Sequence, residues 1–329
     1  MTYIIAEMAC SHEGQPELAK FIIDAAGKAG ANAVQYQVWQ LDEIMVPSHP
    51  GFELGGTLEM SQDEWAELMR FNRATYPDME IIACVNDLPS IQFCEDQQVD
   101  AYKIHSSDIS NPMILEGVAK TGRRIDLSVG ASTQAEIEDA LTVIRSFGDP
   151  EIWMMYGYQS FPTPTDGIHL RFLNSLRETY GLPVGYQDHS DADSQAAFRL
   201  PAAAMGMEVE VLEKHITHDR SKKGVDHQAA LNPDEFSEFV AMVREIDQAK
   251  GISGFRQFGE AEEKYRIYSK KSIVAAADLP EGHVLKAGDL RFMRTEELGM
   301  PPDRASDLVS KTLQRKIDKF GRIGEQDVK

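Results

Sequence analysis

Three histidines stand close together near residue 220 and could bind a metal ion or a polar ligand. The segment 211–228 reads VLEKHITHDRSKKGVDHQ and holds His215, His218 and His227 within thirteen positions. An apolar run that ends abruptly in Glu-Lys-His is typical of a buried strand that delivers polar side chains at its end. Which of the three histidines bind something therefore depends on the fold that carries them.

His215 has a candidate partner at the end of the preceding predicted strand. The run PVGYQD (183–188) is followed directly by His189. Two neutral imidazoles suit Mn²⁺, Zn²⁺ or Fe²⁺, and Asp188 or a substrate oxygen could complete the ligand set. The alternative is that both histidines are hydrogen-bonded rim residues, so the metal site is a hypothesis.

The other two histidines lie in the loop after the strand. His218 is flanked by Asp219, Arg220, Ser221 and Lys222, so we expect it to be a solvated loop residue. His227, beside Asp226, either folds back over the mouth of the site to position a substrate or remains a plain loop residue.

A second group of polar residues at predicted strand ends could hold an anion. Lys103, Ser106, Ser128 and Gly130 combine a lysine, two hydroxyls and a backbone N–H, which are the groups that bind phosphate and carboxylate. The alternative for Lys103 is an ion pair inside the barrel, for instance with Glu7, because a buried lysine requires a partner.

These residues need elements that bring them to one place. Apolar, β-rich runs alternate with amphipathic helical stretches up to residue 250. We expect strands at 3–9, 33–38, 80–85, 101–104, 124–130, 152–157, 183–188 and 209–216, with helices at 16–30, 61–76, 111–120, 133–147 and 232–249.

Eight strands, each followed by a helix or a segment of helical length, indicate a parallel sheet buried on both faces. Eight such units in about 250 residues match the size of a (β/α)8 TIM barrel, in which catalytic residues stand at the carboxyl ends of the strands. An open doubly wound sheet is the competing fold, but no GxGxxG follows the first strand.

The pattern changes after residue 250. We expect the barrel to span 1–250, a polar and helix-poor linker to span 251–268, and a small β-rich domain to span 269–329, where Pro-Glu-Gly and Ala-Gly-Asp punctuate short strands. The small domain has too few residues for a large core and needs a surface to pack on.

Composition narrows the class of protein. The 329 residues are 42% hydrophobic, and 53 acidic against 33 basic residues give a net charge of −20. Such a surface repels nucleic acid and anionic membranes. We see no run long enough to span a membrane and no signal peptide, so we expect a cytoplasmic protein whose three cysteines are reduced thiols.

Several segments together resemble the sialic acid synthase family. They are "IIAEMACSHEGQPELAKFIIDAAGKAGANAVQYQ", "YKIHSSDISNPMILEGVAKTG", "LSVGAST", "GLPVGYQDHS", "LEKHITHDRSKKGVDHQAALNPDEF" and "KKSIVAAADLPEGHVL". The resemblance runs through nearly the whole chain in order and spacing, and it includes a C-terminal SAF (antifreeze-like) module.

The resemblance implies a reaction and a cofactor. The family condenses phosphoenolpyruvate (PEP) with an N-acylated aldose, giving a 2-keto-3-deoxy sugar acid of the sialic, legionaminic or pseudaminic type and phosphate. It uses a divalent metal, usually Mn²⁺, held by the two histidines that match His189 and His215. The SAF module of one subunit caps the barrel of the other in a swapped homodimer.

The resemblance also suggests individual roles. Glu13 matches a residue that contacts the sugar and assists proton transfer. The residues that match PEP-binding positions are Lys103, Ser106, Ser128, Gly130 and Gln159, and those expected near the sugar are Gln35, Asp188, Asp226, His227 and Arg294.

Several positions depart from the family pattern. Gln35 stands where a lysine is common, Cys84 lies in a segment that usually reads Ser-Thr-Pro-Phe, and Gln187 replaces a serine. One lost charge-assisted contact weakens anion binding by roughly 1.5–3 kcal/mol. We therefore expect a different acceptor sugar or a changed hold on PEP. The alternatives are a pyruvate-type aldolase or lyase and a non-catalytic sugar-binding relative.

Overall fold

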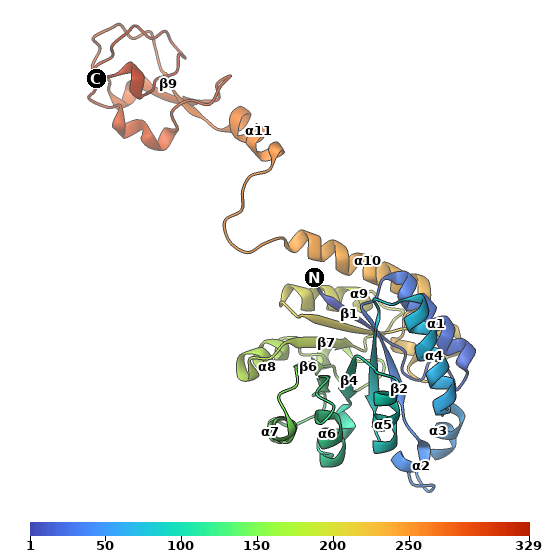
Figure 1. Ribbon diagram of the computed structural model, residues 1–329. Helices are drawn as coiled ribbons and strands as arrows, with labels where there is room; N and C mark the ends of the chain where they lie inside the picture. Colours follow the sequence, from blue (N-terminus) through green and yellow to red (C-terminus); the bar gives the residue numbers. More distant parts are fainter. The chain divides into compact units, whose positions relative to one another are not determined.

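Eight parallel strands close into a barrel within residues 1–251 (Figure 1). The computed structural model describes every residue from Met1 to Lys329. β1 pairs in parallel with both β2 and β8, which closes the ring and confirms the expected (β/α)8 barrel. The strands are β1 (Tyr3–Glu7), β2 (Ala33–Val38), β3 (Glu80–Val85), β4 (Ala101–Ile104), β5 (Arg124–Ser128), β6 (Ile152–Tyr156), β7 (Val184–Asp188) and β8 (Val211–His215).

The helices begin and end at local signals in the sequence. Ser61 and Thr133 each form a capping box with the glutamate three residues later, and Gly30 ends the first helix with a left-handed backbone. Not one helix of the protein combines the length and the apolar character that crossing a membrane requires. The barrel helices are α1 (Pro16–Ala29), α2 (Leu41–Ile44), α3 (Phe52–Leu58), α4 (Gln62–Thr75), α5 (Leu88–Asp96), α6 (Pro112–Ala119), α7 (Gln134–Phe147), α8 (Phe172–Tyr180), α9 (Ala196–Gly206) and α10 (Pro233–Lys250).

An arginine closes the amino end of the barrel. The guanidinium of Arg124 lies 3.9 Å from the ring centroid of Trp153 and donates hydrogen bonds to Glu80 (2.9 Å) and Asp126 (3.0 Å). Tyr3 donates to the same Glu80 carboxylate. These stacked and paired groups join β1, β3, β5 and β6 at this end of the barrel.

The rest of the interior changes from apolar to polar along the strands. Ile5, Ala33, Ile82, Ala101, Met155 and Val211 form a buried apolar layer. Two residues further along several strands the inward side chains are polar, and hydrogen bonds between Lys103, Gln187 and Glu213 cross the interior. Because side chains alternate along a strand, one register sets both layers.

The second unit, residues 252–329, has a small core of its own. β9 (Ser272–Ala275) and β10 (Leu290–Met293) form an antiparallel pair. The expected helix-poor linker is wrong in part, because α11 (Glu260–Ser269) lies within it. Lys264 pairs with Glu260 one turn away and Arg256 with Glu262, and such pairs stabilise a polar helix without an apolar face.

The apolar layer generates a prediction about stability. A Cβ added at Gly185 in β7 would lie 2.3 Å from Sδ of Met155 and 2.9 Å from Cβ of Val211. We expect Gly185→Ala to lower the free energy of unfolding by about 1–3 kcal/mol through overpacking. Gly206→Ala at the end of α9, where a Cβ meets no atom within 4 Å, is the matched control and should not destabilise. Urea denaturation of both variants measures the difference, and an unchanged Gly185→Ala would contradict the packing argument.

Candidate active site at the carboxyl end of the barrel

His189 and His215 come together at the carboxyl ends of β7 and β8. Their ring centroids are 5.2 Å apart, and the Phe161 ring packs against both, with centroids at 4.3 and 5.6 Å. Glu213 completes the set, since one ligand atom from each of the three residues lies within 4.8 Å of the others. Both histidines are buried, with exposed fractions of 4%.

Both imidazoles are neutral at neutral pH. Burial lowers the pKa of His189, and burial together with the neighbouring His189 lowers the pKa of His215 well below its usual value. Nδ1 of His189 donates to the backbone carbonyl of Tyr158 over 2.9 Å, which leaves Nε2 with its lone pair. Neutral imidazoles with free lone pairs are the form that binds a metal ion.

A buried ion pair lies directly beneath the histidines. Lys103 Nζ is 2.6 Å from Glu213 Oε1 and 3.8 Å from Glu7 Oε2, so the structure realises the ion-pair alternative for Lys103. Burial raises the pKa of Glu7 against the opposing effect of Lys103, which favours the neutral form of this carboxyl. Lys103 and Glu213 balance each other's charge in this layer.

The residues expected to hold PEP surround this ion pair. Ser128 donates to Gln187 (3.0 Å), whose amide donates in turn to Glu213 (3.0 Å). Gly130 has room only for a hydrogen, because a Cβ there would lie 2.2 Å from the carbonyl oxygen of Gly157 and 2.7 Å from the amide nitrogen of Gln159. Ser106 opens the short helix η1 (Ser106–Asp108) after β4 and is half-buried.

Two of the other expected ligand-binding residues, Asp188 and Arg294, lie away from the site, whereas Gln35 faces the barrel interior two positions after Ala33. Asp188 faces out of the barrel, contrary to expectation, because the alternation along β7 turns it away from Gln187 and His189; its carboxylate accepts hydrogen bonds from Lys214, Tyr186 and Ser190. Gln35 is fully buried in β2, and neither atom of its amide has a hydrogen-bond partner. Arg294 is exposed in the second unit directly after β10.

Glu213 is a site residue that the sequence analysis left without a role. It stands two positions before His215, and residues two apart on a strand face the same side. That spacing could have indicated that Glu213 faces the same site as His215. Its Oε2 and the Nδ1 of His215 are buried without a hydrogen-bond partner, which fits a site built to receive a positively charged or hydrogen-donating ligand.

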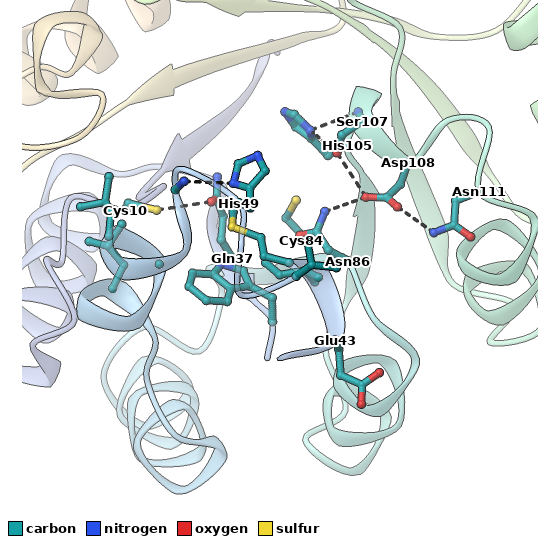
Figure 2. Close-up of a pocket in the computed structure, with 18 residues that line it drawn as sticks. Cys10, Gln37, Glu43, His49, Cys84, Asn86, His105, Ser107, Asp108 and Asn111 are labelled. Carbon is teal, nitrogen blue, oxygen red and sulfur yellow. Dashed lines mark hydrogen bonds between the residues drawn. The ribbon is translucent and has the colours of Figure 1, made fainter. Parts of the chain in front are cut away.

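The segment 39–60 walls a cavity of about 770 Å³ over the ends of β2, β3 and β4 (Figure 2). Figure 2 shows Asp108 held by hydrogen bonds from Asn86 and Asn111, both 2.8 Å long. Burial, with Lys103 as the second cause, lowers the pKa of His105 to about 4. The lining contains neither lysine nor arginine, and its apolar part is Ile44, Met45, Val46, Leu54 and Leu58 with Trp39.

A second cluster joins the loop after β1 to the loop after β8. Glu13, His218 and His227 have ligand atoms within 4.8 Å of one another. The solvated position expected for His218 is wrong, because its side chain is only 12% exposed and its Nδ1 lies 3.1 Å from the carbonyl oxygen of Ser11. Asp226 precedes His227 and is half-buried.

Comparison with known proteins identifies relatives along the whole chain. Residues 22–254 match the model of the NeuB family. An N,N'-diacetyllegionaminic acid synthase of Campylobacter jejuni is 28% identical over 89% of this chain and 90% of its own. An N-acetylneuraminate-9-phosphate synthase of Homo sapiens is 28% identical over 98% and 92%. The crystal structure of an N-acetylneuraminic acid synthetase from Leptospira borgpetersenii superposes with a TM-score of 0.73 at 27% identity, over 80% of this chain and 91% of the other.

The buried histidines predict a pH dependence of stability. Burial lowers the pKa of His12 to about 4, against 6.5 in the unfolded chain. Between these values the unfolded state binds the extra proton, so this contribution to stability is present above pH 6.5 and is lost as the pH falls. Glu7, whose folded-state pKa is raised, acts in the opposite direction, so wild type must be compared with a single variant.

We expect wild type to lose stability relative to His12→Gln by up to about 1.4 kcal/mol per pH unit between pH 6 and 4.5. Urea denaturation at several pH values measures this slope, and the exposed His49→Gln serves as the control with the wild-type slope. Parallel curves for wild type and His12→Gln would show that His12 takes up a proton in the folded state.

Proposed function

The chain is an enzyme of the NeuB family, and from that premise we propose that it condenses PEP with an N-acylated aldose. The product is a 2-keto-3-deoxy sugar acid of the sialic, legionaminic or pseudaminic type, and phosphate is released. C3 of PEP forms the new bond to the aldehyde carbon, water adds to C2, and the C2–O bond to phosphate breaks. The observation that carries the proposal is the set His189, Glu213 and His215 above the Lys103 ion pair.

His189 and His215, with Glu213, would hold a divalent metal, which we propose to be Mn²⁺. The neutral imidazoles and the unpartnered atoms of His215 and Glu213 support this assignment. When bound there, such a cation would polarise the aldehyde oxygen of the acceptor. Phe161 covers both rings and limits the access of water to them.

Lys103, Ser106, Ser128, Gly130 and Gln159 would bind PEP. Lys103 has three N–H donors and uses one on Glu213, so the others are free for an anion. Gly130 lets the donor approach the backbone closely, since a side chain there would collide with Gln159. Burial raises the pKa of Glu7, which favours its neutral form and reduces the negative charge beside the donor.

Glu13, Asp226 and His227 would act on the acceptor. Glu13 is about one-third exposed. Its carboxylic acid can donate a proton to the aldehyde oxygen of the acceptor, which becomes a hydroxyl in the product. We further propose that a partner subunit's second unit covers this barrel in a homodimer, with Arg294 directed at the acyl group of the sugar. The exposed Phe292 and Met293 beside Arg294 support a covered face there.

The cavity walled by the segment 39–60 favours an uncharged acceptor. It offers apolar side chains for acyl or methyl groups and no lysine or arginine for a phosphate. Glu43 and Asp108 add negative charge to its wall. A sugar 6-phosphate would meet no lysine or arginine in this cavity. Because the reaction adds three carbons, that acceptor is the one that would give a 9-phosphate product.

Phosphate release tests the reaction. With Mn²⁺, PEP and a panel of N-acylated and plain aldoses, we expect release with one class of sugar and a fall of about 10²–10³-fold in His215→Ala. Circular dichroism controls for the fold of the variant. If no sugar supports release while metal is bound, the pyruvate-type aldolase alternative replaces this proposal.

The charge of the cavity generates a separate prediction. We expect kcat/KM for a neutral N-acylated aldose to exceed that for its 6-phosphate. Val46 is 64% exposed in the cavity wall, and Val46→Lys should raise the relative kcat/KM of the 6-phosphate by about tenfold, the effect of one charge-assisted contact. Val46→Gln is the uncharged control. Equal use of both sugars by wild type would contradict the argument from the lining.

A further inference from the structure

The cluster of Glu13, His218 and His227 has the composition of a metal site separate from the His189 set. Glu13 lies in the turn after β1, His218 follows β8, and His227 opens the short helix η4 (His227–Ala229). Oε1 of Glu13 is 4.0 Å from Nε2 of His218 and 3.8 Å from Nε2 of His227. Both imidazoles therefore direct the same kind of nitrogen at one carboxylate oxygen.

These separations are too long for hydrogen bonds and close to those of ligands that share a cation. Two atoms that are each about 2.0–2.1 Å from a tetrahedral cation stand roughly 3.4 Å apart. Contraction by about half an ångström would bring Oε1 of Glu13 to that distance from both imidazole nitrogens. Glu13 and His218 both keep some exposure, so side-chain rotation can supply the movement.

The orientation of the rings also fits metal ligation. Nδ1 of His218 lies 3.1 Å from the carbonyl oxygen of Ser11, and donation to that oxygen leaves the lone pair on Nε2, facing Glu13. The ring of His227 is fully buried, and its Nε2 lies 3.1 Å from the hydroxyl of Thr217. Rotation of that hydroxyl hydrogen away from the ring would free the lone pair of Nε2 for a cation.

The surrounding backbone is shaped to admit this cluster. A Cβ at Gly224 would lie 2.9 Å from Nε2 of His227 and 3.1 Å from Oε1 of Glu13, so the loop can pass there only as glycine. Glu13 and Asp226 both adopt left-handed φ angles, +52° and +63°, which are unfavourable for residues with a Cβ. Nδ1 of the buried His227 has no hydrogen-bond partner.

We propose that Glu13, His218 and His227 bind a second divalent transition-metal cation, with Zn²⁺ as the best match. Two imidazoles and one carboxylate are a ligand set that leaves a fourth position open on Zn²⁺. In an enzyme acting on sugars this open position accepts a hydroxyl or carbonyl oxygen of the acceptor, and that consequence alone rests on the proposed function. A relay of protons between Glu13 and the two imidazoles, without a cation, is the competing account.

Metal stoichiometry of the full chain tests the proposal. After removal of metal by a chelator, Zn²⁺ and Co²⁺ are titrated by calorimetry and bound metal is counted by mass spectrometry. We expect two bound metal ions per chain in wild type, one in His218→Leu and one in the double variant His189→Ala/His215→Ala. The triple variant, which combines all three substitutions, should bind none. His218→Leu should weaken the affinity for the second metal ion about 100-fold or more. Substitution of a residue that only hydrogen-bonds to a metal ligand already lowers metal affinity by about 10–100-fold.

Two further variants keep the result interpretable. Glu13→Gln removes the ligand charge at constant volume, and it should lose the same equivalent as His218→Leu if His218→Leu folds poorly. His49→Leu, at an exposed histidine outside both clusters, should keep both equivalents. The visible spectrum of bound Co²⁺ in the double variant should report a site of low coordination number that disappears in the triple variant.

The outcomes separate this inference from the proposed reaction. Wild type with one equivalent that survives His218→Leu, or two equivalents that both survive it, overturns the second site. Two equivalents with the expected losses but no phosphate release leave the second site established and the proposed reaction wrong. Normal phosphate release with a single metal that needs only His189 and His215 favours the proton relay.

Discussion

The architecture of the site depends on the ion pair between Lys103 and Glu213, which crosses the inside of the barrel over 2.6 Å. A lysine buried here without a partner would lose its proton or would destabilise the folded barrel. Because Glu213 also accepts from Gln187, which accepts from Ser128, the pair ties β4, β5, β7 and β8 into one polar layer. Removing either partner would leave a buried charge unpaired, which costs far more than the pair itself contributes.

The alternation of side chains along β7 and β8 decides which polar residues belong to the site. Glu213 and His215 face inward, whereas Lys214 between them faces outward and binds Asp188 over 2.5 Å. This second ion pair links the two strands on the side that the helices cover. It therefore fixes the position of His189 relative to His215 along the barrel axis. One register therefore produces two buried ion pairs, one that joins β7 to β8 on the outside of the barrel and one that lies inside it beneath His189 and His215.

The sequence predicted the parts of this arrangement that depend on local patterns. Apolar runs of strand length and amphipathic helical stretches were enough to predict the barrel and five of its ten helices, α1, α4, α6, α7 and α10. Asp188 was assigned wrongly because position at a strand end does not say which face a residue takes. The burial of His218 could not be predicted, since it depends on the turn after β1, more than 200 residues away in the sequence.

The charges at the barrel mouth bear directly on the choice of donor. PEP carries up to three negative charges and pyruvate carries one, while Gln35 contributes to the barrel interior only an uncharged amide without a hydrogen-bond partner. Lys103 is largely neutralised by Glu213, and the adjoining cavity offers no other cationic side chain. Burial raises the pKa of Glu7, which favours its neutral form and lowers the remaining repulsion. A donor with the charge of PEP can therefore bind well only if cations accompany it, and the two histidine clusters are the places in this barrel where such cations would be held.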